Sequence, residues 1–303
     1  MLTILTFVFI LILIPTNALA WGMGIHLQVG SEILADLSLF SPYLQEIMGR
    51  FPYDFFYGCI SADIIIGKKF THYLEHCHSW RVGKKVLDAA RSERQKACAY
   101  GYLAHLAMDT IGHSFFVPYK IVRTYSTTIT KHTYWEMRLE AEVRPDIWEL
   151  AQALGRQDFR ENDALLRSVL ADTLFSFRTN KQIFNSLLLL SRLKQSQKML
   201  RSYSRSSKWA LDKKDVEEYL SLAREAAVDV LLQQEKSPYW KADPSGERAL
   251  AAAKMIRRNL NTLWLDGKLP PGDALAILKE LKERLREGVT QPEKLLELLS
   301  SEP

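Results

Sequence analysis

The chain has 303 residues, of which 47% are hydrophobic and 25% are charged, and its formal net charge is +5. These values fit a globular protein with a sizeable core and exclude a largely disordered chain. The clustered basic patch that is typical of nucleic-acid binders does not stand out. The three cysteines contain no Cys-x-x-Cys pair, and their odd number excludes a fully paired disulfide framework. One disulfide among Cys59, Cys77 and Cys98 stays compatible with the sequence.

The N-terminus carries the pattern of an export signal. Residues 2–14 are mainly apolar, Pro15 ends the run, and Ala18-Leu19-Ala20 follows. An apolar run before a small-x-small motif predicts a signal peptide over residues 1–20, cleaved after Ala20, and a secreted or periplasmic protein. No Lys or Arg precedes the run. The alternative is an uncleaved membrane anchor, although a spanning helix needs roughly 20 apolar residues.

Apolar residues recur at helical spacing through almost all of the chain after residue 25, and runs that alternate in period two are absent. We therefore predict an all-α fold. The predicted helices, in chain order, are Leu27–Leu37, Ser79–Ala90, Lys96–Phe116, Tyr134–Leu154, Asn162–Phe177, Ile183–Leu200, Val216–Gln234, Glu247–Leu265, Asp273–Gly288 and Pro292–Leu299. The amphipathic stretch from about Lys241 onward is interpreted as a solvated helical pair on the core, or alternatively as a helix for a membrane surface or a partner.

All seven histidines lie between residues 26 and 132. In the segment AYGYLAHLAMDTIGHSFF, the spacing i, i+4, i+8 puts His105, Asp109 and His113 on one helix face. The rest of this helix is so apolar that it should be buried. Three buried ionisable groups would cost several kcal/mol unless they are paired or bind a metal ion. The pattern favours a metal site and leaves a hydrogen-bonded core network as the alternative.

Three further groups can join such a site. His132 and Glu136 stand at i, i+4, as in helical zinc sites, although such pairs are also common on exposed helices. Asp63 occupies a loop-like position ahead of His72, His76 and His78. His26 follows the predicted cleavage site closely, in Trp21-Gly22-Met23-Gly24-Ile25-His26.

Taken together, these motifs resemble the zinc-dependent phospholipase C family, which shares its fold with the P1-type single-strand nucleases. The resemblance covers about residues 21–140. It rests on a Trp at the mature N-terminus, the His-x-x-x-Asp helix with a later His, and a final His-x-x-x-Glu. The opening Trp21, Gly22 and His26 are spaced as in the family's Trp-Gly-x-x-Gly-His, with Ile25 at the position of the second Gly. It implies a multi-helix domain with a trinuclear zinc site, a catalytic domain over residues 21–240 and a C-terminal helical extension over residues 241–303.

The resemblance also implies which residues hold the three zinc ions. The first set is Trp21, through its own amine and carbonyl, with His26 and Asp109. The second set is Asp63, one histidine of the 72–78 cluster, His105 and Asp109, with His78 favoured over His76 and then His72. The third set is His113, His132 and Glu136. Asp109 would bridge two ions, and Asp63 would be the catalytic residue that orients or deprotonates the attacking water.

The resemblance implies a phosphodiesterase, and one detail favours a phospholipase C acting on phospholipids: the last ligand is Glu136, as in the phospholipases, where the nucleases carry Asp. Three residues separate Asp109 from His113, where the nucleases and secreted toxins have five, and this shorter spacing resembles the glycosylphosphatidylinositol-specific phospholipase D branch. A membrane surface is a further expected partner, and no protein partner is evident. One alternative is a single-strand nuclease or 3′-nucleotidase, whose base-stacking pocket would draw on Trp80, Tyr100, Tyr102, Phe115, Phe116 or Trp135. The other is a non-catalytic metal-binding helical protein.

Overall fold

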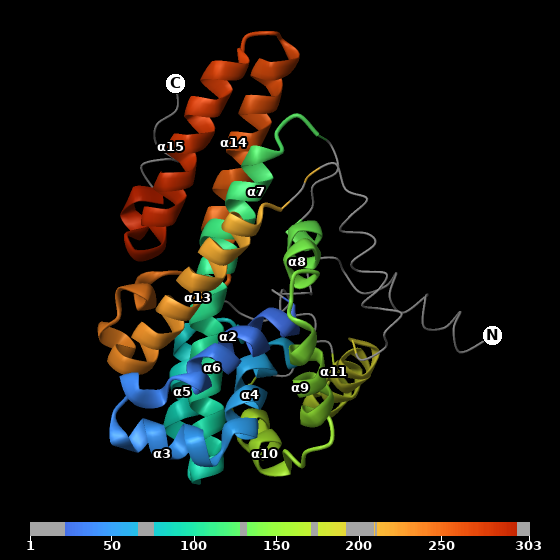
Figure 1. Ribbon diagram of the computed structural model, residues 1–303, viewed down its shortest axis with the longest axis vertical. Helices are drawn as coiled ribbons and strands as arrows, with labels where there is room; N and C mark the ends of the chain where they lie inside the picture. Colours follow the sequence, from blue (N-terminus) through green and yellow to red (C-terminus); the bar gives the residue numbers. More distant parts are fainter. Residues whose placement is uncertain are drawn as a thin grey trace, which may run out of the picture.

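The computed structural model describes residues 22–65, 76–127, 132–170, 175–191, 209 and 211–295. Every regular element in these ranges is a helix, so the predicted all-α class is confirmed (Figure 1). Of the sequence predictions, the signal peptide, Trp21 and His72 lie outside the described residues. None of the described helices is long and apolar enough to cross a membrane. Cys59, Cys77 and Cys98 are all buried and none forms a disulfide.

A long helix runs through the middle of the molecule (Figure 1). α6 (Glu93–Ile111) begins at a capping box, in which Ser92 accepts from the Gln95 amide and Gln95 returns the contact. Every residue from Ala97 to Ile111 is buried. The helix continues through the π-helical turn η5 (Gly112–Phe116) into α7 (Val117–Arg123). The predicted helix over Lys96–Phe116 is therefore present but extends further at both ends.

The neighbouring helices surround α6 closely. A Cβ atom on Gly58 would overlap the carbonyl oxygen of Cys98, and one on Gly101 would overlap that of Phe55. The backbones of α4 and α6 are therefore in direct contact. In the first part of the chain, α6 is contacted by α2 (Met23–Ala35), α3 (Pro42–Arg50), α4 (Pro52–Ser61), η2 (Ala62–Ile64) and α5 (Trp80–Ala89), while η1 (Leu37–Leu39) packs against α3.

The structure corrects two predicted helices. The stretch Tyr134–Leu154 forms α8 (His132–Glu140) and α9 (Pro145–Leu154), because Pro145 disfavours helical backbone at Arg144, whose ψ is 144°. The stretch predicted over Asn162–Phe177 forms α10 (Arg160–Val169), which ends at the extended Leu170. Phe177 instead opens α11 (Phe177–Ser191), ahead of the predicted start at Ile183.

The C-terminal part packs against the same central helix. α13 (Lys213–Gln233) lies along α6 and is followed by η6 (Gln234–Lys236) and η7 (Pro238–Lys241). α14 (Glu247–Leu265), whose bounds match the prediction, and α15 (Pro271–Thr290) form a helical hairpin against α7 and η5 (Figure 1). Residues 241–303 thus contribute contacts to the core helix through their described part.

Candidate metal centre

Asp109 lies at the middle of a buried cluster of histidines. Its Oδ2 is 3.1 Å from Nε2 of His78 and 3.2 Å from Nε2 of His105, and its Oδ1 is 3.4 Å from Nε2 of His26. The side chains of His26, His105 and Asp109 are fully buried. Neither carboxylate oxygen of Asp109 accepts a hydrogen bond of good geometry. The carboxylate is therefore surrounded by nitrogen atoms that contact it without the bonds that would normally compensate its burial.

Four elements bring this cluster together. α6 carries His105 and Asp109 one turn apart, α2 supplies His26, and η2 supplies Asp63. His78 stands just before α5, whose first turn is fixed by the Ser79 hydroxyl accepting from the Val82 amide. Nε2 of His78 is also 3.2 Å from Oδ1 of Asp63 and 3.2 Å from Nε2 of His105. Two overlapping ligand groups result, one of His26, His105 and Asp109, the other of Asp63, His78 and His105.

The structure distinguishes between the two described histidines of the 72–78 cluster. His78 points its Nε2 at Asp63 and Asp109, whereas His76 accepts the His78 backbone amide through Nδ1 at 3.1 Å. His76 forms a separate group with Cys77 and His78. Of these two, His78 is the residue placed beside Asp63.

A third group forms at the far end of α6. Nε2 of His132 is 2.7 Å from Oε1 of Glu136, and Nε2 of His113 is 3.3 Å from the same oxygen. His113 lies in the π-helical turn, a local distortion that is frequent at functional sites. Its Nδ1 is 3.9 Å from Oδ2 of Asp109, so the third group adjoins the other two.

Backbone carbonyls fix the ring orientation of two histidines. Nδ1 of His105 lies 2.8 Å from the carbonyl oxygen of Cys59, and Nδ1 of His113 lies 2.8 Å from that of Pro244. Because a carbonyl only accepts, each Nδ1 must carry the proton and donate it. In His105 the lone pair of Nε2 is then free to bind a metal ion, as is usual for zinc-ligating histidines. Nε2 of His113 lies 3.3 Å from Oε1 of Glu136. Burial alone would lower the pKa of His113, but Asp109 and Glu136 outweigh it and raise this pKa, so this ring would lose a proton when it binds a metal.

The carboxyl and imidazole groups perturb one another strongly. Burial and the neighbouring His105 lower the pKa of His26, which keeps its ring neutral. Burial alone would raise the pKa of Asp109, but His113 and His105 outweigh it and hold this pKa well below its usual range. The same balance, with His132 and His113 as the partners, lowers the pKa of Glu136. The site thus stabilises charged carboxylates and contains a neutral imidazole, the protonation states that metal binding needs.

Glu140 was missed by the sequence predictions although it continues the spacing of His132 and Glu136 by one more turn. Its side chain is half-buried, and its carboxylate accepts from the Gly24 amide at 2.9 Å and from the Ile25 amide at 3.2 Å. α2 has no side-chain cap of its own, so Glu140 caps its first turn. A Cβ atom on Gly22 would overlap this carboxyl group, which explains a glycine there. Glu140 therefore fixes the start of the helix that carries His26.

The distances within the clusters fit a zinc ion. Zn–N and Zn–O bonds of about 2.0–2.1 Å in tetrahedral geometry separate the ligand atoms by roughly 3.3–3.4 Å. The contacts of Asp109 with His26, His78 and His105, at 3.1–3.4 Å, fall close to this spacing. Oε2 of Glu136 is likewise buried without a hydrogen-bond partner. Imidazole nitrogens and carboxylate oxygens are the zinc ligand set, so the residues present fit the metal.

Residues 25–169 match the family model described as zinc dependent phospholipase C. This part of the chain belongs to the zinc-dependent phospholipase C family. The match contains every described side chain of the three groups, from His26 to Glu136, and stops short of Trp21. No curated protein and no solved structure matches the chain significantly. The phospholipase C family domain thus accounts for the chemistry of the site, while α13 to α15 lie beyond the matched segment.

Proposed function

We propose that the chain is an exported zinc-dependent phosphodiesterase, a phospholipase C that hydrolyses the phosphodiester of phospholipids. The observation that carries the proposal is the position of Asp109, whose two oxygens face His26 on one side and His78 and His105 on the other. A third group of His113, His132 and Glu136 adjoins it. This arrangement supports three neighbouring ions in a domain of this family.

The proposed ligand sets follow the three groups. Asp109 would be shared by the first two ions, and Trp21 would complete the set of His26 and Asp109. His78 takes the position in the second set, beside Asp63 and His105. Zinc, when bound, polarises phosphoryl oxygens and lowers the pKa of water enough to make it a nucleophile near neutral pH.

Asp63 is the proposed catalytic residue among these side chains. It is 16% exposed, whereas His78 and Asp109 beside it are at most 1% exposed. A carboxylate at the solvent edge of a buried cluster is placed to orient an incoming water and to accept its proton. In the third group, His132 is the residue that reaches solvent, with a side chain that is 24% exposed. Substrate would therefore approach from the side on which these two residues reach solvent.

Phospholipid is favoured over nucleic acid because the aromatic residues suggested for a base-stacking pocket are all buried. Tyr102, Phe115, Phe116 and Trp135 are at most 1% exposed, and Tyr100 and Trp80 reach only 8–9%. Trp80 stacks on Trp240, with ring centroids 4.4 Å apart. These side chains pack the core and are not available to a nucleobase.

Export is part of the proposal, since the free amine of Trp21 arises only when residues 1–20 are removed. The matching test compares a chain that starts at Trp21 with one that carries an added Gly-Ser before it. Zinc content and hydrolysis of a choline phospholipid and of single-stranded DNA are measured for both. N-terminal sequencing of the exported protein checks the cleavage point.

The proposal expects about three zinc ions per chain, hydrolysis of the phospholipid, and loss of activity in the extended form. Hydrolysis of DNA alone would establish the nuclease alternative. Zinc binding without hydrolysis of either substrate would leave a non-catalytic metal-binding protein. Full activity of the extended form would exclude the role of the Trp21 amine.

A further inference from the structure

Large apolar side chains are exposed on both sides of the turn between α14 and α15. Leu263 is 39% exposed, Trp264 44%, Leu265 69% and Leu275 71%. The turn beside them lies at the end of the hairpin farthest from α3 (Figure 1). Isolated exposed apolar residues are normal, but Trp264 and Leu275 line one apolar groove beside this turn, and such a grouping marks an interaction surface.

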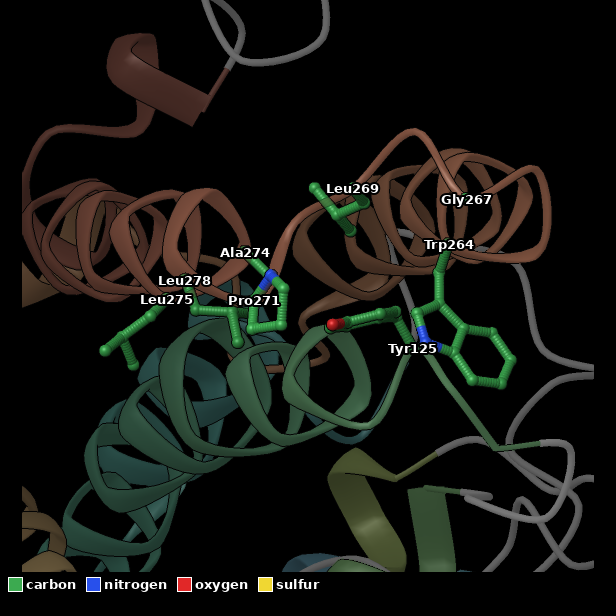
Figure 2. A pocket seen from close by; sticks show the side chains of 8 residues that line it. All are labelled: Tyr125, Trp264, Gly267, Leu269, Pro271, Ala274, Leu275 and Leu278. Carbon is green, nitrogen blue, oxygen red and sulfur yellow. The ribbon is translucent and has the colours of Figure 1, made fainter.

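The turn is built to hold these side chains in place. Gly267 has a φ of +67°, and its amide donates to the Trp264 carbonyl at 3.1 Å, while the Lys268 amide donates to the Leu263 carbonyl at 2.8 Å. Such a glycine-based cap ends α14 firmly, and Pro271 starts α15. A groove of about 420 Å³ lies within this group, lined among others by Tyr125, Trp264 and Leu275 (Figure 2).

The same end of the hairpin is basic. Residues 254–279 contain five basic residues (Lys254, Arg257, Arg258, Lys268 and Lys279) and two acidic ones (Asp266 and Asp273), a net charge of +3. Lys254, Arg258 and Lys279 are exposed, as is Lys268, which pairs with Asp266 at 3.4 Å. Arg257 is half-buried and donates to the Thr127 carbonyl. Farther along α15 the charges balance, as in the pair Arg284–Glu280 and in the contact of Lys282 with Glu218. The positive excess is thus confined to the exposed apolar end.

We propose that this end of the hairpin, residues 254–279, docks on a lipid bilayer that contains anionic headgroups. Trp and Leu side chains in a fixed turn match the interfacial layer of a membrane, where an amphipathic indole is favoured. The surrounding Lys and Arg side chains match the negative surface potential of anionic lipids. A second copy of the chain would bring the same positive charge to the contact and fits less well.

The docking surface is separate from the metal centre. α14 starts just after Pro244, which contacts His113, and its 19 residues span about 28 Å at 1.5 Å per residue. The surface would therefore hold the enzyme at the membrane without taking part in the chemistry. The role of this surface in catalysis rests on the proposed phospholipid substrate. Membrane binding itself can be measured without any catalytic turnover.

The test is flotation of the chain starting at Trp21 with vesicles of phosphatidylcholine, with and without about 30% phosphatidylglycerol. The tip variant combines Trp264→Ser and Leu265→Ser, and the charge variant combines Arg258→Glu and Lys279→Glu. The matched control combines Leu39→Ser and Tyr43→Ser, two side chains that are each 47% exposed near α3, away from the hairpin turn. Hydrolysis of a water-soluble phosphodiester is measured on the same preparations.

We expect the tip variant to weaken vesicle binding roughly 10- to 30-fold and the charge variant to weaken binding to the anionic vesicles about tenfold. The control should bind like the unaltered chain, and hydrolysis of the soluble diester should stay unchanged in all variants. Unaltered protein that does not float, or a tip variant that floats equally well, overturns the docking proposal. So does a tip variant that only converts a dimer to a monomer in sedimentation. Vesicle binding without any diester hydrolysis would instead overturn the proposed function alone.

Discussion

Glu140 on α8 caps the first turn of α2 by accepting a hydrogen bond from the backbone amide of Gly24, 116 residues earlier in the chain. α8 also carries His132 and Glu136, and α2 carries His26 two residues after Gly24. One carboxylate therefore joins the helix that supplies part of the third metal group to the helix that supplies part of the first. Changes at Glu140 should affect both folding and metal content.

We predict that Glu140→Ala destabilises the protein by about 2–6 kcal/mol, because two buried amide donors lose their acceptor at about 1–3 kcal/mol each. The shifted start of α2 should also lower the zinc content at His26. Denaturant unfolding and metal analysis check both effects. Glu142→Ala, at an exposed position two residues later, is the control and should change neither. Equal stability of the two variants would contradict the capping role.

Glu140 also makes a prediction about pH. Burial raises its pKa from an ordinary 4.5 to about 7, so the folded state favours the protonated carboxyl group. Its contribution to stability is complete below pH 4.5 and is lost as the pH rises through about 7. The test compares the unfolding free energies of the zinc-free unaltered chain and of zinc-free Glu140→Gln. The advantage of the unaltered chain should decrease as the pH rises from 4.5 to about 7. A flat difference would show that folding does not raise the pKa of Glu140.

Two glycines with positive φ allow a comparison of two effects of an alanine substitution. At Gly267 alanine would only strain the backbone, whereas at Gly246 it would also collide with a residue of the metal centre. Gly246 has a φ of +62° and a Cβ there would overlap His113, whereas Gly267 has a φ of +67° and open space around it. Gly267→Ala should cost about 1–2 kcal/mol from backbone strain alone and leave zinc binding intact. Gly246→Ala should cost more and displace His113 from Glu136. Loss of one zinc ion only in Gly246→Ala is the expected result, and equal zinc content in both variants would contradict it.

Asp109→Asn tests the bridging position. An amide is a much weaker zinc ligand than a carboxylate. Because Asp109 faces both the His26 side and the His78–His105 side, we expect the loss of two of three ions while the His113 group keeps its own. Zinc per chain, counted by native mass spectrometry, should fall from about three to about one. The loss of only a single ion would show that Asp109 belongs to one group.

The structure brings together the central residues that the sequence placed on shared helix faces, and their role as metal ligands stays a prediction. His105, Asp109 and His132–Glu136 depend on one period within one helix, and a buried apolar setting makes their polarity conspicuous. Glu247–Leu265 was placed correctly for a similar reason, since Gly246 precedes it and Asp266-Gly267 ends it. Local signals of this kind need no knowledge of the tertiary structure.

What the sequence could not supply depends on contacts between distant segments. The backbone carbonyls of Cys59 and Pro244 orient His105 and His113. Every residue has such a carbonyl, so the sequence cannot indicate which ones make these contacts. The choice between His76 and His78 depends on which ring faces Asp63, and the π-helical turn at His113 depends on packing against α14 and α15. The break at Pro145 was available from the sequence, because the residue before proline avoids helical backbone.

The most direct test of the account is anomalous diffraction at the zinc edge from crystals of the chain starting at Trp21. The account predicts three anomalous peaks: one between His26 and Asp109, one among Asp63, His78, His105 and Asp109, and one among His113, His132 and Glu136. The His76–Cys77–His78 group should hold no peak of its own. The absence of zinc at Asp109, or a single ion at the His76–Cys77–His78 group, would contradict the central claim.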